Sequence, residues 1–365
     1  MVLLSKVLKG FSLKSVFVSG STSISLPGKG FSKGGYLLEL LAGMGFQLSH
    51  DPKSDFLLMF DHNSVDFRRY RKYGGHKDRT ILIRLEPPAI FPHQYSKSVE
   101  GKYGRIYTPG SILNLEKSEE ILGWVYRYDI NPVEPTKEVQ AETKLKFATE
   151  PWELLRNWQN RQVKISMVAA NKVSPVSNQN YSLRRKIARQ LPADLLSVYG
   201  PLWNDSYSQK IRHRAAVIKF AFTQGTFPNL ISVYGGLHKK YRTTKGQIPN
   251  KHEVMKNSKF CIVVENSNTY FSEKLFDALW DGTIPLFIGP DIEKFLRNGS
   301  IGINISGDPR EILEILDSLS DHEVTDLLQG GRDFIQSAYF RDYWTEEGVY
   351  KKVSEEILNR WNSLS

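Results

Sequence analysis

The stretch of sequence that decides the fold is residues 259–290, KFCIVVENSNTYFSEKLFDALWDGTIPLFIGP. It contains an apolar run at 260–264, a polar loop, a helical pattern and a second apolar run at 284–288. The helical pattern begins after Ser272, a residue type that caps helix N-termini, and stops at Gly282, a residue type that ends helices. The order strand, loop, helix, turn, strand is the unit from which parallel sheets covered by helices are built.

The same alternation of short apolar runs and helical patterns extends through both halves of the chain. In the first half the apolar runs are 15–20, 55–60 and 80–85, with a helical pattern at 36–41. In the second half apolar runs at 163–170 and 195–199 flank a helical pattern at 183–191, and an amphipathic helix is expected at 345–361. Short apolar strands separated by helices predict an α/β fold with parallel, doubly wound sheets.

The chain divides most naturally near residue 150. Residues 131–150 are polar, contain two prolines and have no hydrophobic period, as expected of a linker between domains. A chain of 365 residues is also long for a single core. We therefore predict two Rossmann-like domains facing a cleft, one over residues 1–150 and one over 151–365, and clefts of this kind bind ligands.

The charge and cysteine content narrow the possible partners and compartment. A net charge of +10, with basic clusters at 68–72 and 239–242, attracts anions such as nucleic acid, acidic lipid or phosphorylated small molecules. The absence of zinc-finger spacing and of an RNP-type motif disfavours nucleic acid.

The single cysteine, Cys261, lies in an apolar run and favours a reducing compartment. No apolar stretch reaches the ~20 residues that span a bilayer, and residues 1–9 do not form a signal-peptide core. We expect a cytoplasmic protein, with contact to a membrane surface left open.

Four polar residues in the deciding stretch point to a ligand. Asn266, Tyr270, Glu273 and Lys274 fall between the carboxyl end of a strand and the amino end of a helix. Unpaired backbone N–H groups and an ammonium there favour a diphosphate, and a carboxylate can accept hydrogen bonds from both hydroxyls of a ribose. On the pattern alone, Glu273 and Lys274 are also compatible with ordinary first-turn residues.

The order of these residues resembles the signature of the α-1,3/1,4-fucosyltransferases, family 10 of the glycosyltransferases. Glu-Asn-Ser at 265–267, Tyr-x-Ser-Glu-Lys at 270–274 and Ile-Pro-Leu-Phe-Ile-Gly at 284–289 follow one another as they do in that family. Two features depart from its pattern: the loop between residues 267 and 270 is shorter, and Val264 replaces a Phe. The resemblance implies a GT-B architecture, a donor bound by the C-terminal domain and inversion at the anomeric carbon. It predicts the nucleotide more firmly than the sugar.

The same resemblance assigns two further residues. The family places a phosphate-binding Arg seven residues before a Leu, which selects Arg184 against Leu191, with Arg185 as the alternative. It also places a catalytic base at the end of a strand before proline, which corresponds to Glu86 in Arg-Leu-Glu-Pro-Pro at 84–88. A partly desolvated carboxylate is a usable base near neutral pH, and an Arg fork holds phosphate oxygens in pairs. From the residues alone, both positions are compatible with ordinary surface or loop roles.

The expected reaction uses no cofactor and no obligatory metal. The Asp-x-Asp motif that holds a divalent ion in GT-A glycosyltransferases does not occur in the sequence, and the histidines show no paired ligand spacing. We therefore expect a GDP-sugar donor, GDP-fucose in the first place, and a glycan acceptor bound by the N-terminal domain. Transfer of another GDP-hexose and non-catalytic binding of glycans or nucleotides are the alternatives. The acceptor, the linkage and the oligomeric state stay open.

Overall fold

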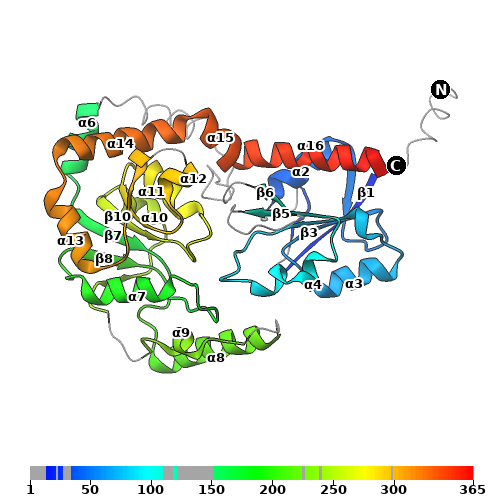
Figure 1. Cartoon of the computed structure of the whole chain (residues 1–365), viewed down its shortest axis with the longest axis horizontal. Coiled ribbons are helices and arrows are strands. Elements are labelled where there is room, and N and C mark those ends of the chain that lie inside the picture. The colour runs from blue at the N-terminus through cyan, green and yellow to red at the C-terminus, as the bar shows by residue number, and fades with distance from the viewer. Residues whose placement is uncertain are drawn as a thin grey trace.

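A computed structural model describes residues 14–21, 24–27, 34–109, 118–121, 151–223, 227–237, 241–296 and 299–364. These residues form two α/β lobes side by side (Figure 1). The predicted linker at 131–150, and with it the predicted boundary, lies outside the described residues. None of the helices in the described ranges combines the length and hydropathy that crossing a bilayer requires.

The N-terminal lobe is built on a parallel six-stranded sheet in the order β2-β1-β3-β4-β5-β6. Its strands are β1 (Lys14–Gly20), β2 (Phe46–Ser49), β3 (Phe56–Phe60), β4 (Thr80–Ile83), β5 (Arg105–Pro109) and β6 (Ser118–Ile121). Its helices are α2 (Gly35–Gly43), α3 (Ser64–Lys72) and α4 (Lys97–Glu100). Alternate residues of β3 face opposite sides: Leu58 packs in the cluster with α2, and Leu57 packs in the cluster with α3. Because both faces are covered, β3 is apolar throughout rather than alternating.

The C-terminal lobe carries a second parallel sheet, in the order β12-β11-β10-β7-β8-β9. Its strands are β7 (Val163–Val168), β8 (Leu196–Tyr199), β9 (Thr244–Gly246), β10 (Ser258–Val264), β11 (Ile284–Ile288) and β12 (Ile303–Asn304). Counted within the lobe, this is the Rossmann order 3-2-1-4-5-6. The chain reverses its direction across the sheet between β7 and β10, so a crevice is expected at the carboxyl ends of these two strands.

Helices cover both faces of the second sheet. The helices of this lobe are α6 (Pro151–Gln159), α7 (Tyr181–Gln190), α8 (Tyr207–Thr223), α9 (Leu230–Tyr234), α10 (Lys251–Met255), α11 (Glu273–Trp280), α12 (Ile292–Leu296), α13 (Pro309–Ser318), α14 (Asp321–Gln336) and α15 (Ala338–Trp344). The last helix, α16 (Glu346–Leu364), follows α15. The predicted caps of α11 are confirmed: the Ser272 side chain accepts from the backbone N–H of Lys274, and Gly282 adopts a φ of 62° after the last turn. Two doubly wound α/β domains, as predicted, are therefore present.

The last helix crosses from one lobe to the other. α16 extends from the C-terminal lobe over the N-terminal lobe (Figure 1), where Val353 and Ile357 join the cluster that contains Leu38 of α2. Trp361 stacks on Phe56 of β3 with ring centroids 4.2 Å apart. The helix itself was predicted, but its partner was not. In space α16 belongs with the N-terminal sheet, although it lies in the 151–365 range assigned to the other domain.

Candidate functional site

A cavity of about 450 Å³ opens at the carboxyl ends of β7 and β10, where the Rossmann order predicts a crevice. Both lobes line it: Glu86 and Ile90 come from the N-terminal lobe and the other lining residues from the C-terminal lobe. Its charged lining residues are Glu86, Lys172, Arg184, Lys251, Glu273, Lys274 and Asp277. All six residues predicted as the site, Glu86, Arg184, Asn266, Tyr270, Glu273 and Lys274, line this cavity.

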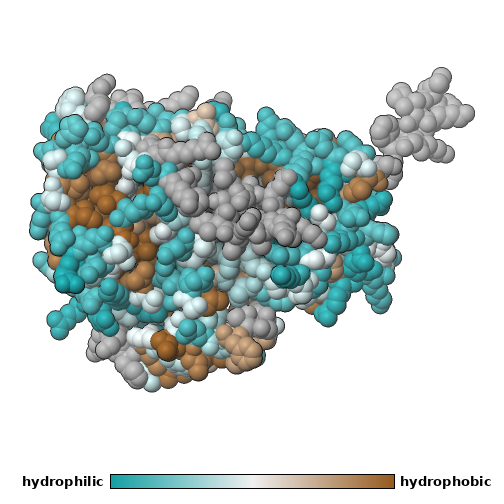
Figure 2. All heavy atoms as spheres, viewed as in Figure 1, coloured by the Kyte–Doolittle hydropathy of each residue, from teal (hydrophilic) through white to brown (hydrophobic). Residues whose placement is uncertain are grey.

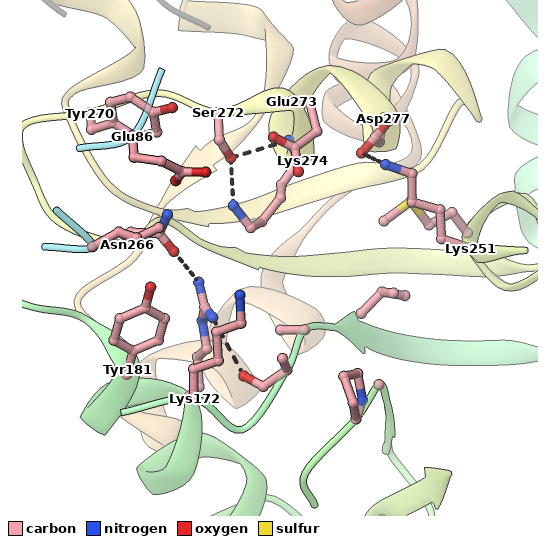
Figure 3. Close-up of a pocket in the computed structure, with 18 residues that line it drawn as sticks. Glu86, Lys172, Tyr181, Lys251, Asn266, Tyr270, Ser272, Glu273, Lys274 and Asp277 are labelled. Atoms are coloured by element: carbon pink, nitrogen blue, oxygen red, sulfur yellow. Dashed lines mark hydrogen bonds and ion pairs between the residues drawn. The ribbon is translucent and has the colours of Figure 1, made fainter. Parts of the chain in front are cut away.

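The backbone at Glu86 is held from two sides. Asp61 accepts hydrogen bonds at Oδ1 from the backbone N–H of Leu85 (2.7 Å) and of Glu86 (3.1 Å). The Glu86 carbonyl accepts from Gln94 Nε2 and from the Tyr95 hydroxyl, each at 2.9 Å. The partly buried Glu86 side chain extends toward Asn266 and the N-terminal end of α11 (Figure 3). A carboxylate on a fixed backbone at the edge of a cavity has the placement that a general base requires.

Asp61 is a buried carboxylate in an unusual backbone conformation, with a φ of 53°. Burial raises its pKa from 3.8 to about 6; hydrogen bonds from Leu85 and Gln94 oppose the rise, and the nearby Glu86 charge adds to it. Because the folded-state pKa is raised, the folded protein holds a proton between pH 4 and pH 6 that the unfolded chain has released. The free energy of unfolding therefore falls as pH rises through this window.

We expect Asp61→Asn to remove this part of the pH dependence. Asn tolerates a positive φ and keeps an acceptor oxygen for the two backbone N–H groups, but it cannot ionise. Relative to the wild type, the variant should gain up to about 3 kcal/mol of unfolding free energy between pH 4 and pH 7.5, because two pKa units correspond to about that much. Urea unfolding at both pH values measures the difference. Parallel pH profiles for the two proteins would contradict the argument.

Arg184 is almost fully buried at the cavity wall. Its Nη2 donates to the Val264 carbonyl at 2.6 Å and to Asn266 Oδ1 at 3.1 Å, and its guanidinium lies 4.6 Å from the ring centroid of Tyr181. Burial lowers its pKa. Its Nε is buried and has no hydrogen-bond partner in the structure. These contacts fix the guanidinium beneath the end of β10 with donor capacity left for an anion.

Arg185, the alternative to Arg184, points elsewhere. Its guanidinium donates to the carbonyls of Lys172 (2.9 Å) and Ser232 (3.4 Å), and it does not line the cavity. Successive residues of a helix point about 100° apart, so adjacent arginines of α7 cannot both face the ligand. The geometry therefore favours Arg184 over Arg185 as the phosphate contact, an assignment that stays a prediction.

Lys274 lies in the first turn of α11, lines the cavity and forms an ion pair with Glu265. Its Nζ lies 2.5 Å from Ser272 Oγ and 3.3 Å from Glu265 Oε2. Glu265 is fully buried and also accepts from the Ser272 N–H at 2.7 Å. The ammonium has three donors, so a bound anion could share it with Glu265. Sequence reasoning recognised the Glu265 position only as part of a motif and missed its role in holding Lys274.

The remaining predicted residues come from the loop after β10 and from the start of α11. Asn266 holds Arg184 through its side chain and accepts at its backbone carbonyl from the Asn180 N–H at 3.0 Å. The Tyr270 hydroxyl donates across the cleft to the Leu85 carbonyl at 3.3 Å. Glu273 is the first residue of α11 and is partly buried. Tyr270 thus connects the loop after β10 to the residue that precedes Glu86.

Three charged residues at the cavity were not predicted. Lys172 follows β7, while Lys251 of α10 is ion-paired with Asp277 of α11. Burial raises the pKa of Asp277 to about 6, and the Lys251 charge opposes the rise. A signal for Asp277 existed, because it lies four residues after Glu273 on the same helix face. Lys172 and Lys251 lie in loops and a short helix with no periodic pattern, so sequence offered no comparable signal.

Comparisons with known proteins establish the type of fold. The sequence matches no protein-family model and no curated protein. A crystal structure of Alr3699/HepE from Anabaena in complex with UDP matches 95% of this chain and 100% of its own, at 10% identity and a TM-score of 0.50. A crystal structure of an α1,3-fucosyltransferase matches 95% of this chain and 90% of its own, at 14% identity and a TM-score of 0.48. A glycosyltransferase from Rickettsia africae ESF-5 matches 95% and 99%, at 10% identity and a TM-score of 0.44. Two facing Rossmann-like domains are the GT-B arrangement, and the chain has the GT-B fold.

Proposed function

We propose that this chain is an inverting glycosyltransferase of the α-1,3/1,4-fucosyltransferase type, which moves L-fucose from GDP-fucose to a carbohydrate hydroxyl. One observation carries the proposal. A single cavity combines a carboxylate on one lobe, Glu86, with Arg184, Glu273 and Lys274 on the other. A protein that only binds nucleotides has no need for a fixed carboxylate on the opposite wall.

On the donor side, each residue has a distinct task. Arg184 and Lys274 take the diphosphate oxygens, together with the backbone N–H groups in the first turn of α11. Glu273 accepts from the ribose hydroxyls. Asn266 keeps the Arg184 guanidinium in place, since it accepts from Nη2 at 3.1 Å. Tyr270 fixes the same loop against the N-terminal lobe.

The chemical step is one displacement across the cleft. The acceptor hydroxyl gives its proton to the Glu86 carboxylate while its oxygen forms a bond to the anomeric carbon. The bond from that carbon to the diphosphate oxygen breaks, and its electron pair leaves with GDP on the opposite face. The departing charge is held by Arg184, Lys274 and the α11 N-terminus. Attack opposite the leaving group inverts the anomeric configuration, so no covalent intermediate with the enzyme forms.

The metal requirement follows from Arg184 and Lys274, and the compartment from the single cysteine. These two cations and the helix N-terminus supply the charge neutralisation that a divalent ion supplies in GT-A enzymes, so we propose that transfer needs no metal. The buried thiol of the single cysteine, Cys261, suits a reducing compartment, and we propose that the enzyme acts in the cytoplasm.

A donor screen tests the proposal. GDP-fucose, GDP-mannose, UDP-glucose and a dTDP-sugar are each incubated with a mixed glycan pool, with and without EDTA, and release of the nucleoside diphosphate is measured. The expected result is fastest release from GDP-fucose, unchanged by the chelator. Preference for GDP-mannose or UDP-glucose would contradict the fucose assignment. If no donor releases its nucleoside diphosphate but the protein still binds GDP, a non-catalytic binding protein is favoured.

A further inference from the structure

A surface of exposed apolar side chains covers α8 and α9, on the lower edge of the C-terminal lobe as seen in Figure 1. Figure 2 shows apolar atoms along the same edge. Phe227, Ile231 and Phe222 are 91%, 86% and 58% exposed. The residues of this α8–α9 surface are Tyr207, Ile211, Phe222, Phe227, Leu230, Ile231 and Tyr234. Apolar residues that are scattered singly need no explanation, but a contiguous group of this size marks an interaction site.

The arrangement of these side chains is regular. Tyr207, Ile211, Ala215, Ile218 and Phe222 recur at intervals of three and four residues, so they form one stripe along α8. Other residues of the two helices point inward: Ala221 of α8 and Val233 of α9 are fully buried.

A buried arginine fixes the two helices to each other. Arg214 of α8 donates from Nη1 to the carbonyl of Tyr234 at 2.9 Å. The Phe222 and Phe227 rings lie edge to face, with centroids 6.5 Å apart. The α8–α9 surface therefore lies on two helices that are already fixed to each other in the structure.

The segment between Asp205 and Glu253, which carries this surface, is basic. Positions 206–250 contain no Asp or Glu. The basic residues of this segment are Lys210, Arg212, Arg214, Lys219, Lys239, Lys240, Arg242 and Lys245. Exposed Arg212 and Lys219 directly follow Ile211 and Ile218 of the stripe, and they lie two helical turns apart on one flank of it.

We propose that the α8–α9 surface docks this protein onto an anionic lipid bilayer. Exposed Phe, Ile and Leu side chains flanked by Lys and Arg are suited to the boundary between lipid headgroups and acyl chains, where apolar burial and attraction to acidic lipid act together. A second copy of this chain fits less well, because a two-fold interface over this face would bring the same basic flanks together. Docking itself is independent of the proposed transfer reaction.

The position of this surface has a consequence that rests on the proposed function. Phe220 of α8 lies 6.0 Å, between ring centroids, from Phe91 in the segment that follows Glu86. Residues 220 and 222 point about 160° apart around a helix, so the stripe faces away from Phe91, while α8 itself lies beside the segment that follows the base. An acceptor glycan held on a lipid in the same bilayer would therefore have to extend past α8 to reach the cavity.

Vesicle co-sedimentation tests the docking. The full chain is mixed with phosphatidylcholine vesicles that contain phosphatidylglycerol, and with pure phosphatidylcholine vesicles, without any sugar nucleotide. We expect binding to the anionic vesicles, weakened by salt. Phe222→Ser/Phe227→Ser/Ile231→Ser should abolish it. Arg212→Gln/Lys219→Gln should weaken it about 25-fold, since each basic residue near an anionic surface contributes about a factor of five.

Matched controls come from helices on the opposite edge. Trp152→Ser removes an exposed aromatic of α6, and Arg156→Gln/Lys351→Gln removes two exposed charges from α6 and α16. Both should bind vesicles as the wild type does, and thermal unfolding checks that every variant is folded. Equal binding by surface and control variants would overturn the proposal. The proposal would also be overturned if the wild type formed a dimer that the triple variant disrupts and did not bind vesicles. Because no donor is present, a failure here is distinguishable from a failure of the transferase assignment.

Discussion

Replacing Glu86 by Gln is expected to lower turnover by about 10²- to 10⁴-fold, the contribution that a positioned proton transfer makes. Donor affinity should change little, because the proposed donor contacts lie on the other lobe. Glutamine keeps the length of the side chain, and the hydrogen bonds from Gln94 and Tyr95 to the backbone carbonyl of residue 86 do not depend on the charge of that side chain. A loss of rate would therefore report lost basicity rather than a rearranged loop. Steady-state kinetics over pH 5–9 measure it, and the acidic limb of the rate profile should disappear.

The matched control is Glu39→Gln, which makes the same chemical change at an exposed position of α2. It should have wild-type turnover and the wild-type pH profile. A Glu86→Gln enzyme that turns over at the wild-type rate and keeps the acidic limb would mean that another group accepts the proton.

Lys274→Ala is expected to weaken GDP binding by about 1.5–3 kcal/mol, the free energy of a charge-assisted hydrogen bond. The structure adds a second expected effect on stability. Lys274 Nζ is the ion-pair partner of the fully buried Glu265, at 3.3 Å, and an unpaired buried carboxylate costs about 3–5 kcal/mol. Calorimetry with GDP and urea unfolding separate the two losses.

The double variant Lys274→Ala/Glu265→Gln distinguishes a lost contact from a damaged fold. Glutamine keeps an acceptor for the Ser272 N–H, so stability should recover while GDP affinity stays low. Lys256→Ala, at an exposed position after α10, is the control and should bind GDP normally. Recovery of GDP affinity in the double variant would show that Lys274 supports the fold and does not hold the diphosphate.

Much of the fold could be predicted because the signals were local. The buried strands of both sheets, among them β3, β7, β10 and β11, are apolar runs, and Ser272 and Gly282 mark the ends of α11. Strand β4 ends at Ile83 rather than at Leu85, since beyond it the backbone N–H of Leu85 turns to Asp61. Edge strands such as β9 and β12 are two or three residues long and have no readable pattern.

Contacts between distant segments could not be predicted from the sequence. The amphipathic pattern of α16 predicts a helix, but nothing in it indicates that Trp361 packs on Phe56 of the other lobe. The pairing of Lys274 with Glu265 depends on how α11 leaves the loop, and the Asp61 support of Glu86 joins residues 25 positions apart. The six predicted site residues were nevertheless brought to one cavity, because a strand-end motif places its residues at a known edge of a parallel sheet.

Hydrogen–deuterium exchange with and without GDP tests most directly the claim that the cleft at the ends of β7 and β10 is the donor site. A diphosphate held by the α11 N-terminus and Arg184 should slow exchange of backbone amides at 265–276 and 181–185, with little change on the α8–α9 surface. Protection of these two segments together is the predicted result. Bound GDP that leaves both unprotected, or that protects only a surface outside the cleft, would contradict the account.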